Sequence, residues 1–97
     1  MAEESKTAKS KSPLSGREVI QRAREQLEEM MGRPVEAVLG MERDAEGWVV
    51  TVQVVELQRI PSSTDVLGSY DVDVDGDGVV VGYRRIRRYY RNRADEG

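Results

Sequence analysis

The chain has 97 residues and a formal net charge of −3, from 18 acidic and 15 basic side chains, and this length suits one small domain. It contains neither cysteine nor histidine, which excludes disulfide bonds, thiol nucleophiles, Cys/His zinc sites and imidazole acid–base chemistry. We therefore expect no enzymatic activity and no cofactor.

The first residues differ in composition from the rest of the chain. Residues 1–13 are polar and contain few apolar side chains, so burial cannot offset the entropy lost on ordering. The sequence predicts a disordered N-terminal arm over residues 1–13, a single α+β domain over residues 14–93 and a C-terminal tail over residues 94–97. The arm lacks the apolar stretch of an export signal, and no apolar run approaches the roughly 20 residues that span a bilayer. We expect a soluble, cytoplasmic protein without a membrane partner.

An amphipathic helix is predicted over residues 16–31. Ser15 and Glu18 have the spacing of a capping box, in which each side chain binds the backbone N–H of the other residue. Apolar residues then recur at the helical period and share one face: Val19, Ala23, Leu27, Met30 and Met31. Gly32 suits the left-handed conformation that ends many helices, and Pro34 prevents continuation.

Four strands are predicted beyond the helix, because apolar and polar residues now alternate. They are expected at about residues 35–42, 48–57, 66–74 and 79–89. A first hairpin that closes over residues 44–47 places Met41 opposite Val50, Leu39 opposite Val52 and Ala37 opposite Val54. It also places Arg43 opposite Trp48, where packing or a cation–π contact is expected.

The other two pairings are chosen so that one apolar face continues across the sheet. The last hairpin pairs Val74 with Val79, Val72 with Val81 and Tyr70 with Tyr83. The middle pairing sets Val54 beside Tyr70, Val52 beside Val72 and Val50 beside Val74. The helix is expected to cover the face formed by Leu39, Val52, Val72 and Val81. The predicted fold is α+β, with an N-terminal helix packed on one face of a four-stranded antiparallel meander sheet, in the order α-β-β-β-β.

An acidic segment over residues 71–78 resembles the start of a calcium-binding EF-hand loop. The twelfth loop position should be a bidentate glutamate, but it is Gly82 or Arg84, depending on where the loop begins. Alternation gives a simpler interpretation, in which Asp71 and Asp73 lie on the solvated face of a strand and the following residues form its turn. We therefore expect no metal site here.

Residues 83–93 are the most unusual segment, with six arginines and three tyrosines. Arginines interleaved with aromatic side chains can hold phosphates and stack on bases, and the same residue types are enriched in protein interfaces. The negative net charge and the nearby Asp71 and Asp73 favour a protein partner over nucleic acid. A merely solvated terminal strand is the third interpretation.

Several segments resemble, in order, the gas vesicle protein O family (GvpO) of actinobacterial type. They are GRPV at residues 32–35, GW at 47–48, VVELQRIP at 54–61, TDVLGSYDV at 64–72 and VGYRRIRRY at 81–89. The resemblance covers about residues 17–95. It implies a role in forming gas vesicles, the air-filled protein shells that give cells buoyancy, without enzymatic activity or a cofactor. It also implies importance for the matching residues Glu56, Arg59, Tyr70, Tyr83, Arg84 and Tyr89.

Two functions follow from these observations. The first is an accessory, non-shell protein of gas vesicle assembly or its regulation, associated with the vesicle and binding the shell subunit or another accessory protein. For it, the candidate partner-binding residues are Glu56, Arg59, Tyr83, Arg84, Arg85, Arg87, Arg88 and Tyr89. The alternative is a small nucleic-acid-binding regulator that uses the Arg/Tyr-rich strand. We favour the first.

Overall fold

The computed structural model describes residues 14–94, so the arm expected at residues 1–13 and residues 95–97 of the expected tail lie outside the described residues. Within this range, helix α2 (Gly16–Met31) is followed by strands β1 (Val35–Asp44), β2 (Gly47–Leu57), β3 (Val66–Asp75) and β4 (Val80–Tyr90). A 3₁₀ turn, η1 (Ser62–Thr64), precedes β3, and a short helix, α3 (Arg91–Ala94), follows β4.

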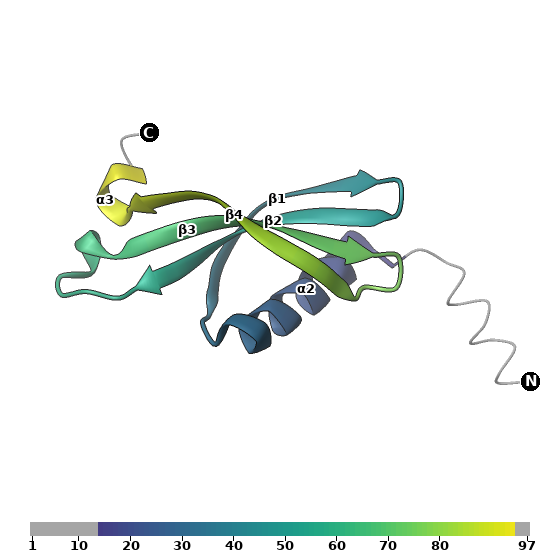
Figure 1. Ribbon diagram of the computed structural model, residues 1–97, viewed down its shortest axis with the longest axis horizontal. Coiled ribbons are helices and arrows are strands. Elements are labelled where there is room, and N and C mark those ends of the chain that lie inside the picture. Colours follow the sequence, from purple (N-terminus) through teal and green to yellow (C-terminus); the bar gives the residue numbers. More distant parts are fainter. Residues whose placement is uncertain (1–13, 95–97) are drawn as a thin grey trace, which may run out of the picture.

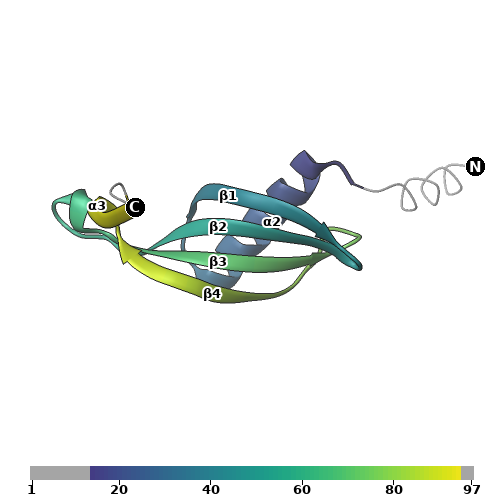
Figure 2. The same cartoon turned by 90° about the horizontal axis from the view of Figure 1, so that it is seen from above.

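The four strands form one antiparallel sheet in the order β1-β2-β3-β4. Helix α2 lies across one face of this sheet (Figures 1 and 2). The predicted α-β-β-β-β meander is therefore confirmed. None of the helices within residues 14–94 has both the length and the apolar character needed to span a membrane.

Helix α2 begins and ends where the local signals predict. The Ser15 hydroxyl oxygen accepts the Glu18 N–H at 3.1 Å, and the Glu18 carboxylate accepts the Ser15 N–H at 2.9 Å, which completes the capping box. Gly32 adopts the left-handed conformation with φ 69°, and its N–H donates to the Glu28 carbonyl oxygen.

The core lies between α2 and the sheet. Val19, Ala23 and Leu27 of the helix are buried against one face of all four strands. The strand residues of this core are Val35, Val50, Val52, Val54, Tyr70, Val72, Val74 and Val80. The predicted face is correct for Val52 and Val72, but Leu39 and Val81 are 52% and 66% exposed.

The first hairpin differs from the predicted register in one half. Met41 lies opposite Val50 as expected, and the Arg43 guanidinium lies 4.7 Å from the centre of the Trp48 ring, in a cation–π contact. Irregularities at Glu36 and Leu39 then put Val38 opposite Val52 and Val35 opposite Val54, in place of Leu39 and Ala37. Because each bulge adds a residue to β1, alternation is interrupted and Leu39 turns to solvent.

The last hairpin differs because its turn is one residue longer. The Asp75 carboxylate accepts the N–H groups of Asp77 and Val79, and the Asp75 N–H donates to the Val79 carbonyl oxygen. Val80 therefore takes the place expected for Val79 opposite Val74. This use of Asp75 supports the structural interpretation of the acidic segment.

A bulge at Val81 adds to the effect of the longer turn, and a bulge at Ile86 displaces the β3–β4 pairing again beyond Arg85. Val72 lies opposite Tyr83 instead of Val81, and Tyr70 lies opposite Arg85 instead of Tyr83. The side chain of Val81 consequently points away from the core.

The β2–β3 register is displaced by two residues from the predicted one. Val50 is opposite Val72, Val52 is opposite Tyr70 and Val54 is opposite Gly68, where the partners expected were Val74, Val72 and Tyr70. A displacement by two keeps every side chain on its face, because the strand repeat is two. The core composition is therefore unaffected by this error.

Candidate functional site

Residues 83–90 of the Arg/Tyr-rich segment lie in the edge strand β4, and their side chains divide between the two faces of the sheet. Tyr83, Arg85 and Arg88 lie opposite Val72, Tyr70 and Gly68, on the face that α2 partly covers. Arg84, Arg87 and Tyr89 lie opposite Asp71, Ser69 and Leu67, on the other face. The eight predicted site residues therefore do not form a single surface.

One group of predicted residues does meet around the carboxylate of Glu56, whose side chain is only 4% exposed. Glu56 Oε2 accepts hydrogen bonds from the Tyr70 hydroxyl and from Arg85 Nε, the latter at 3.1 Å. Arg85 Nη2 lies 3.4 Å from Glu56 Oε1, and Arg88 Nε lies 3.4 Å from the same oxygen. We call Glu56, Tyr70, Arg85 and Arg88 the Glu56 cluster.

Two local features of the backbone allow Glu56 to be buried. Glu56 occupies a bulge between Val55 and Leu57, so it has no residue directly opposite on β3. Its carboxylate lies over Gly68, where an added Cβ would be 2.2 Å from Glu56 Oε2. Only glycine leaves this space free, so Gly68 is part of the site although it contributes no side chain.

The cluster holds Glu56 in its charged form. Burial by itself would raise the pKa of Glu56, but hydrogen bonds from Tyr70 and Arg85 and the charges of Arg85 and Arg88 outweigh it and keep this pKa below the ordinary value. Burial, together with the hydrogen bond to the Glu56 carboxylate, raises the pKa of Tyr70. The cluster thus combines one carboxylate, two guanidinium groups and a neutral phenol.

The arginines of the cluster remain open to solvent, with side chains 47% exposed for Arg85 and 56% for Arg88. Tyr83 is also exposed, and its ring packs edge-on against Tyr70 with centroids 6.0 Å apart. Strand β1 begins at Val35, opposite Val54, whereas β2 runs on to Leu57. Strands β2, β3 and β4 therefore continue beyond β1 and α2 towards α3 (Figure 2). The Glu56 cluster lies where this uncovered extension begins.

On the opposite face, the predicted residues are bound to neighbouring side chains. Arg84 forms ion pairs with Asp71 at 3.6 Å and Asp73 at 3.1 Å, which confirms the expected neutralisation across the sheet. The Arg87 guanidinium lies 4.8 Å from the centre of the Tyr89 ring. The Tyr89 hydroxyl donates to Gln53 Oε1 at 2.6 Å and lies 3.1 Å from Ser69 Oγ.

A second ion-pair group, which the sequence did not reveal, lies at the end of the sheet beside α3. Arg91 pairs with the buried carboxylate of Asp65 at 3.0 Å and with Glu36 at 2.8 Å. The backbone N–H of Arg59 donates to Asp65 Oδ1, and this bond, with help from Arg91, keeps the pKa of Asp65 below its ordinary value despite burial. Arg59 itself is exposed and is not joined to the Glu56 cluster.

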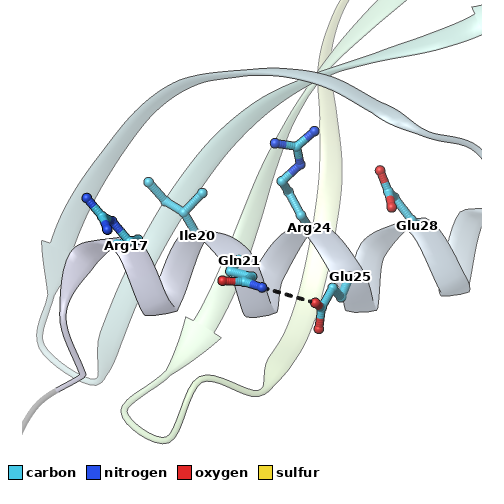
Figure 3. A pocket seen from close by; sticks show the side chains of 6 residues that line it. All are labelled: Arg17, Ile20, Gln21, Arg24, Glu25 and Glu28. Carbon is cyan, nitrogen blue, oxygen red and sulfur yellow. Dashed lines mark hydrogen bonds between the residues drawn. The ribbon is translucent and has the colours of Figure 1, made fainter.

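The structure also has a shallow hollow along α2 (Figure 3). It is lined by Arg17, Ile20, Gln21, Arg24, Glu25 and Glu28, all from one helix. Gln21 Nε2 lies 3.5 Å from Glu25 Oε2. Because no second element contributes a lining residue, this hollow lacks the convergent polar groups that small-molecule sites have.

Sequence reasoning therefore located part of the site. It named Glu56, Tyr83, Arg85 and Arg88, which lie together, but it missed Gly68 as part of this cluster and Asp65 as the partner of Arg91. Both missed residues fall inside the segment TDVLGSYDV, and a glycine within a strand is the available signal for close approach of another group. The role of any of these residues in binding a partner stays a prediction.

Comparison with known proteins adds a further observation. Residues 2–95 match the family described as gas vesicle synthesis protein GvpO. The chain is 43% identical over 83 residues to gas vesicle protein O of a Streptomyces species, covering 86% of this chain and 65% of that one. It is 37% identical over 70 residues to gas vesicle protein O1 of Halobacterium salinarum, covering 72% and 59%.

A third relative is gas vesicle protein O of Haloferax mediterranei, at 34% identity over 71 residues. The chain spans between 51% and 65% of the length of these three curated relatives. No solved structure matches it.

Proposed function

The chain belongs to the gas vesicle synthesis protein GvpO family, and from this membership we propose that it takes part in gas vesicle formation as an accessory, non-shell protein. It acts in the cytoplasm, at the vesicle, by binding another gas vesicle protein and without catalysing a reaction. The binding surface is the Glu56 cluster together with Tyr83.

The observation that carries this proposal is the position of Arg85 and Arg88. Both guanidinium groups are anchored on a buried carboxylate, yet about half of each side chain remains open to solvent. Anchoring restricts their rotamers before binding, so less side-chain entropy is lost when a partner arrives. Arginine and tyrosine are also the residue types that contribute most strongly to protein interfaces.

The same pairings argue against the nucleic-acid alternative. Affinity for nucleic acid rises with the number of phosphates neutralised, but Arg84 is already paired with two aspartates, and Arg85 and Arg88 share Glu56. The arginines also point to two different faces. A continuous track of free positive charge is therefore missing from the described part of β4.

Capture of a partner tests the proposal. The tagged chain is purified from cells that express a whole gas vesicle gene cluster, and the proteins retained with it are identified by mass spectrometry. Tyr83→Ala should abolish retention of another gas vesicle protein, because it removes an exposed aromatic contact without disturbing Glu56.

Arg84→Ala is the matched control, since it changes the adjacent residue on the opposite face, and it should retain the partner. Equal retention by both variants would contradict the assignment of the surface. Failure of the wild-type chain to retain any gas vesicle protein would contradict the function itself.

A further inference from the structure

We infer that the Glu56 cluster receives a carboxylate from an acidic, partly apolar segment of the partner protein. This inference rests on the proposed function and adds the chemistry of the partner. It follows from the charges of the cluster, from the free donors of its arginines and from the apolar side chains beside it.

The cluster has more positive than negative charge. Arg85 and Arg88 both contact Glu56, and no other carboxylate of the described residues lies within ion-pair distance of either guanidinium. Two positive groups thus share one negative group. The surplus positive charge lies on the solvent side of the cluster, because Glu56 is buried beneath the arginines.

The arginines also retain hydrogen-bond donors. A guanidinium has five N–H groups in a planar fork, whereas the contacts within the cluster involve Nε and Nη2 of Arg85 and only Nε of Arg88. The two half-exposed side chains can therefore bind a second carboxylate from outside while they keep Glu56. Such charge-assisted bonds have geometric specificity for a planar carboxylate.

An apolar strip borders the charged group. Val66 is buried, and it lies directly between Leu57 on β2 and Tyr90 on β4, both of which are exposed. This row is two residues along β3 from Gly68, over which the Glu56 carboxylate lies. A segment with an acidic residue next to an apolar one would match both parts of the surface.

A polynucleotide fits this arrangement less well than an acidic peptide. One surplus charge meets one carboxylate, whereas a phosphate backbone gains affinity by neutralising several phosphates in succession. The neighbouring Arg84 and Arg87 lie on the opposite face, where the former is paired with aspartates. Binding of nucleic acid is accordingly an outcome that the experiment must be able to detect.

The test uses variants of Arg88, which is the more exposed of the two arginines and makes a single contact. Capture of a gas vesicle protein from cells expressing the whole cluster is compared for wild type, Arg88→Lys, Arg88→Met and the control Arg87→Met. We expect Arg88→Met to weaken capture about tenfold or more, as expected for loss of a charge pair at an interface. Arg88→Lys, which keeps the charge, and Arg87→Met should retain capture.

Cross-linking then identifies the group that is bound. A carbodiimide joins an amine to a carboxylate only when the two are in contact, so the amine introduced by Arg88→Lys should become linked to an aspartate or glutamate of the captured protein. Mass spectrometry of the linked peptides locates this residue and its apolar neighbours. Replacement of that acidic residue by its amide should weaken capture to the same degree as Arg88→Met.

The outcomes separate the inference from the function on which it rests. Undiminished capture by Arg88→Met, or a cross-link formed only to Glu56 of the chain itself, would contradict the binding of a partner carboxylate by the cluster. The proposed docking of another gas vesicle protein would then still stand. Tight binding of polyuridylate RNA by the wild-type chain, lost in Arg88→Met, would overturn it in favour of nucleic acid. Absence of capture by the wild-type chain would remove the proposed function as well.

Discussion

At the scale of single residues, Glu56 controls the arrangement of the edge strand. A buried carboxylate is stable only when it is paired and hydrogen-bonded, and Glu56 obtains its partners from β3 and β4. In return it orients two arginines that would otherwise move freely in solvent. Without Glu56, Arg85 and Arg88 would be solvated side chains with no fixed geometry.

The lowered pKa of Glu56 predicts how stability depends on pH. In the unfolded chain Glu56 has its ordinary pKa of about 4.3, whereas in the folded chain this pKa is lower. The unfolded chain therefore binds the proton more readily, and the free energy of unfolding decreases as the pH is lowered through this range. Asp65 acts in the same direction. The melting temperature, followed by circular dichroism, should be constant between about pH 5 and 8 and fall towards pH 3.

Glu56→Gln should lower the melting temperature at pH 7 and reduce the fall on acidification. A variant that retained the full wild-type fall would show that Glu56 does not contribute to it. Glu25→Gln is a suitable control, because Glu25 is exposed on α2.

Gly68 is predicted to be coupled energetically to Glu56. Gly68→Ala should reduce the free energy of unfolding by about 1–3 kcal/mol, because the new Cβ displaces a carboxylate that is held by three partners. With Glu56→Ala already present, the same change should cost clearly less, since only the Tyr70 ring, 3.0 Å from the added Cβ, then remains close. Urea unfolding of both single variants and the double variant measures the coupling, and additive effects would rule it out.

At the scale of elements, α2 is attached to both edges of the sheet by side chains on its last two turns. Gln26 donates to the Gly78 carbonyl oxygen at 2.7 Å and accepts the Val80 N–H at 2.9 Å, which joins the helix to the β3–β4 turn. Arg24 donates to the Val35 carbonyl oxygen, and Glu28 accepts the Val35 N–H, which joins the helix to the start of β1. The helix therefore bridges the sheet from its first strand to its last.

Gln26→Ala should lower the free energy of unfolding by about 1–3 kcal/mol, because it leaves the N–H of the buried Val80 without a partner. Gln21→Ala is the matched control on the same helix, since Gln21 makes only a long, exposed contact with Glu25. It should change stability by less than about 0.5 kcal/mol. Equal effects of the two changes in urea unfolding would show that the attachment to the turn is unimportant.

The helix and the strand order could be predicted from the sequence, but much of the register could not. The ends of α2 depend on nearby residues, the Ser15–Glu18 capping box and Gly32, so local signals sufficed. The pairing errors in the two hairpins arise from β-bulges and from a turn extended by Val79. A bulge is stabilised by contacts across the sheet, such as those that hold Glu56, and these leave no periodic pattern.

The sequence also predicted only part of the candidate site. Charge and aromatic content identified β4, but the distribution of its side chains over two faces depends on the bulge at Ile86. The bulge separates Arg85 from Arg87, which the sequence places two residues apart and thus on the same face. That Arg85 shares a face with Arg88 and not with Arg87 is accordingly visible only in the folded chain.

At the scale of the whole molecule, the domain has a helix-covered half and an uncovered half. Figure 1 shows α2 beneath one part of the sheet, while β2, β3 and β4 extend beyond it to α3. The Glu56 cluster lies at the boundary, so the core stabilises a surface that remains accessible. We propose that the covered half provides stability and that the extension provides contacts to a partner.

We propose that the cluster-bearing face of β4 is needed for gas vesicle formation and that the opposite face of the same strand is not. The most direct test replaces the chromosomal gene by one carrying Tyr83→Ala with Arg88→Ala, or one carrying Arg84→Ala with Arg87→Ala, and counts vesicles by electron microscopy. Immunoblots and the melting temperatures of the purified variants confirm that both chains accumulate and fold. We predict that the first strain lacks normal vesicles and that the second forms them. Normal vesicles in the first strain, or loss of vesicles in both strains at equal protein levels, would contradict the proposed role of this face.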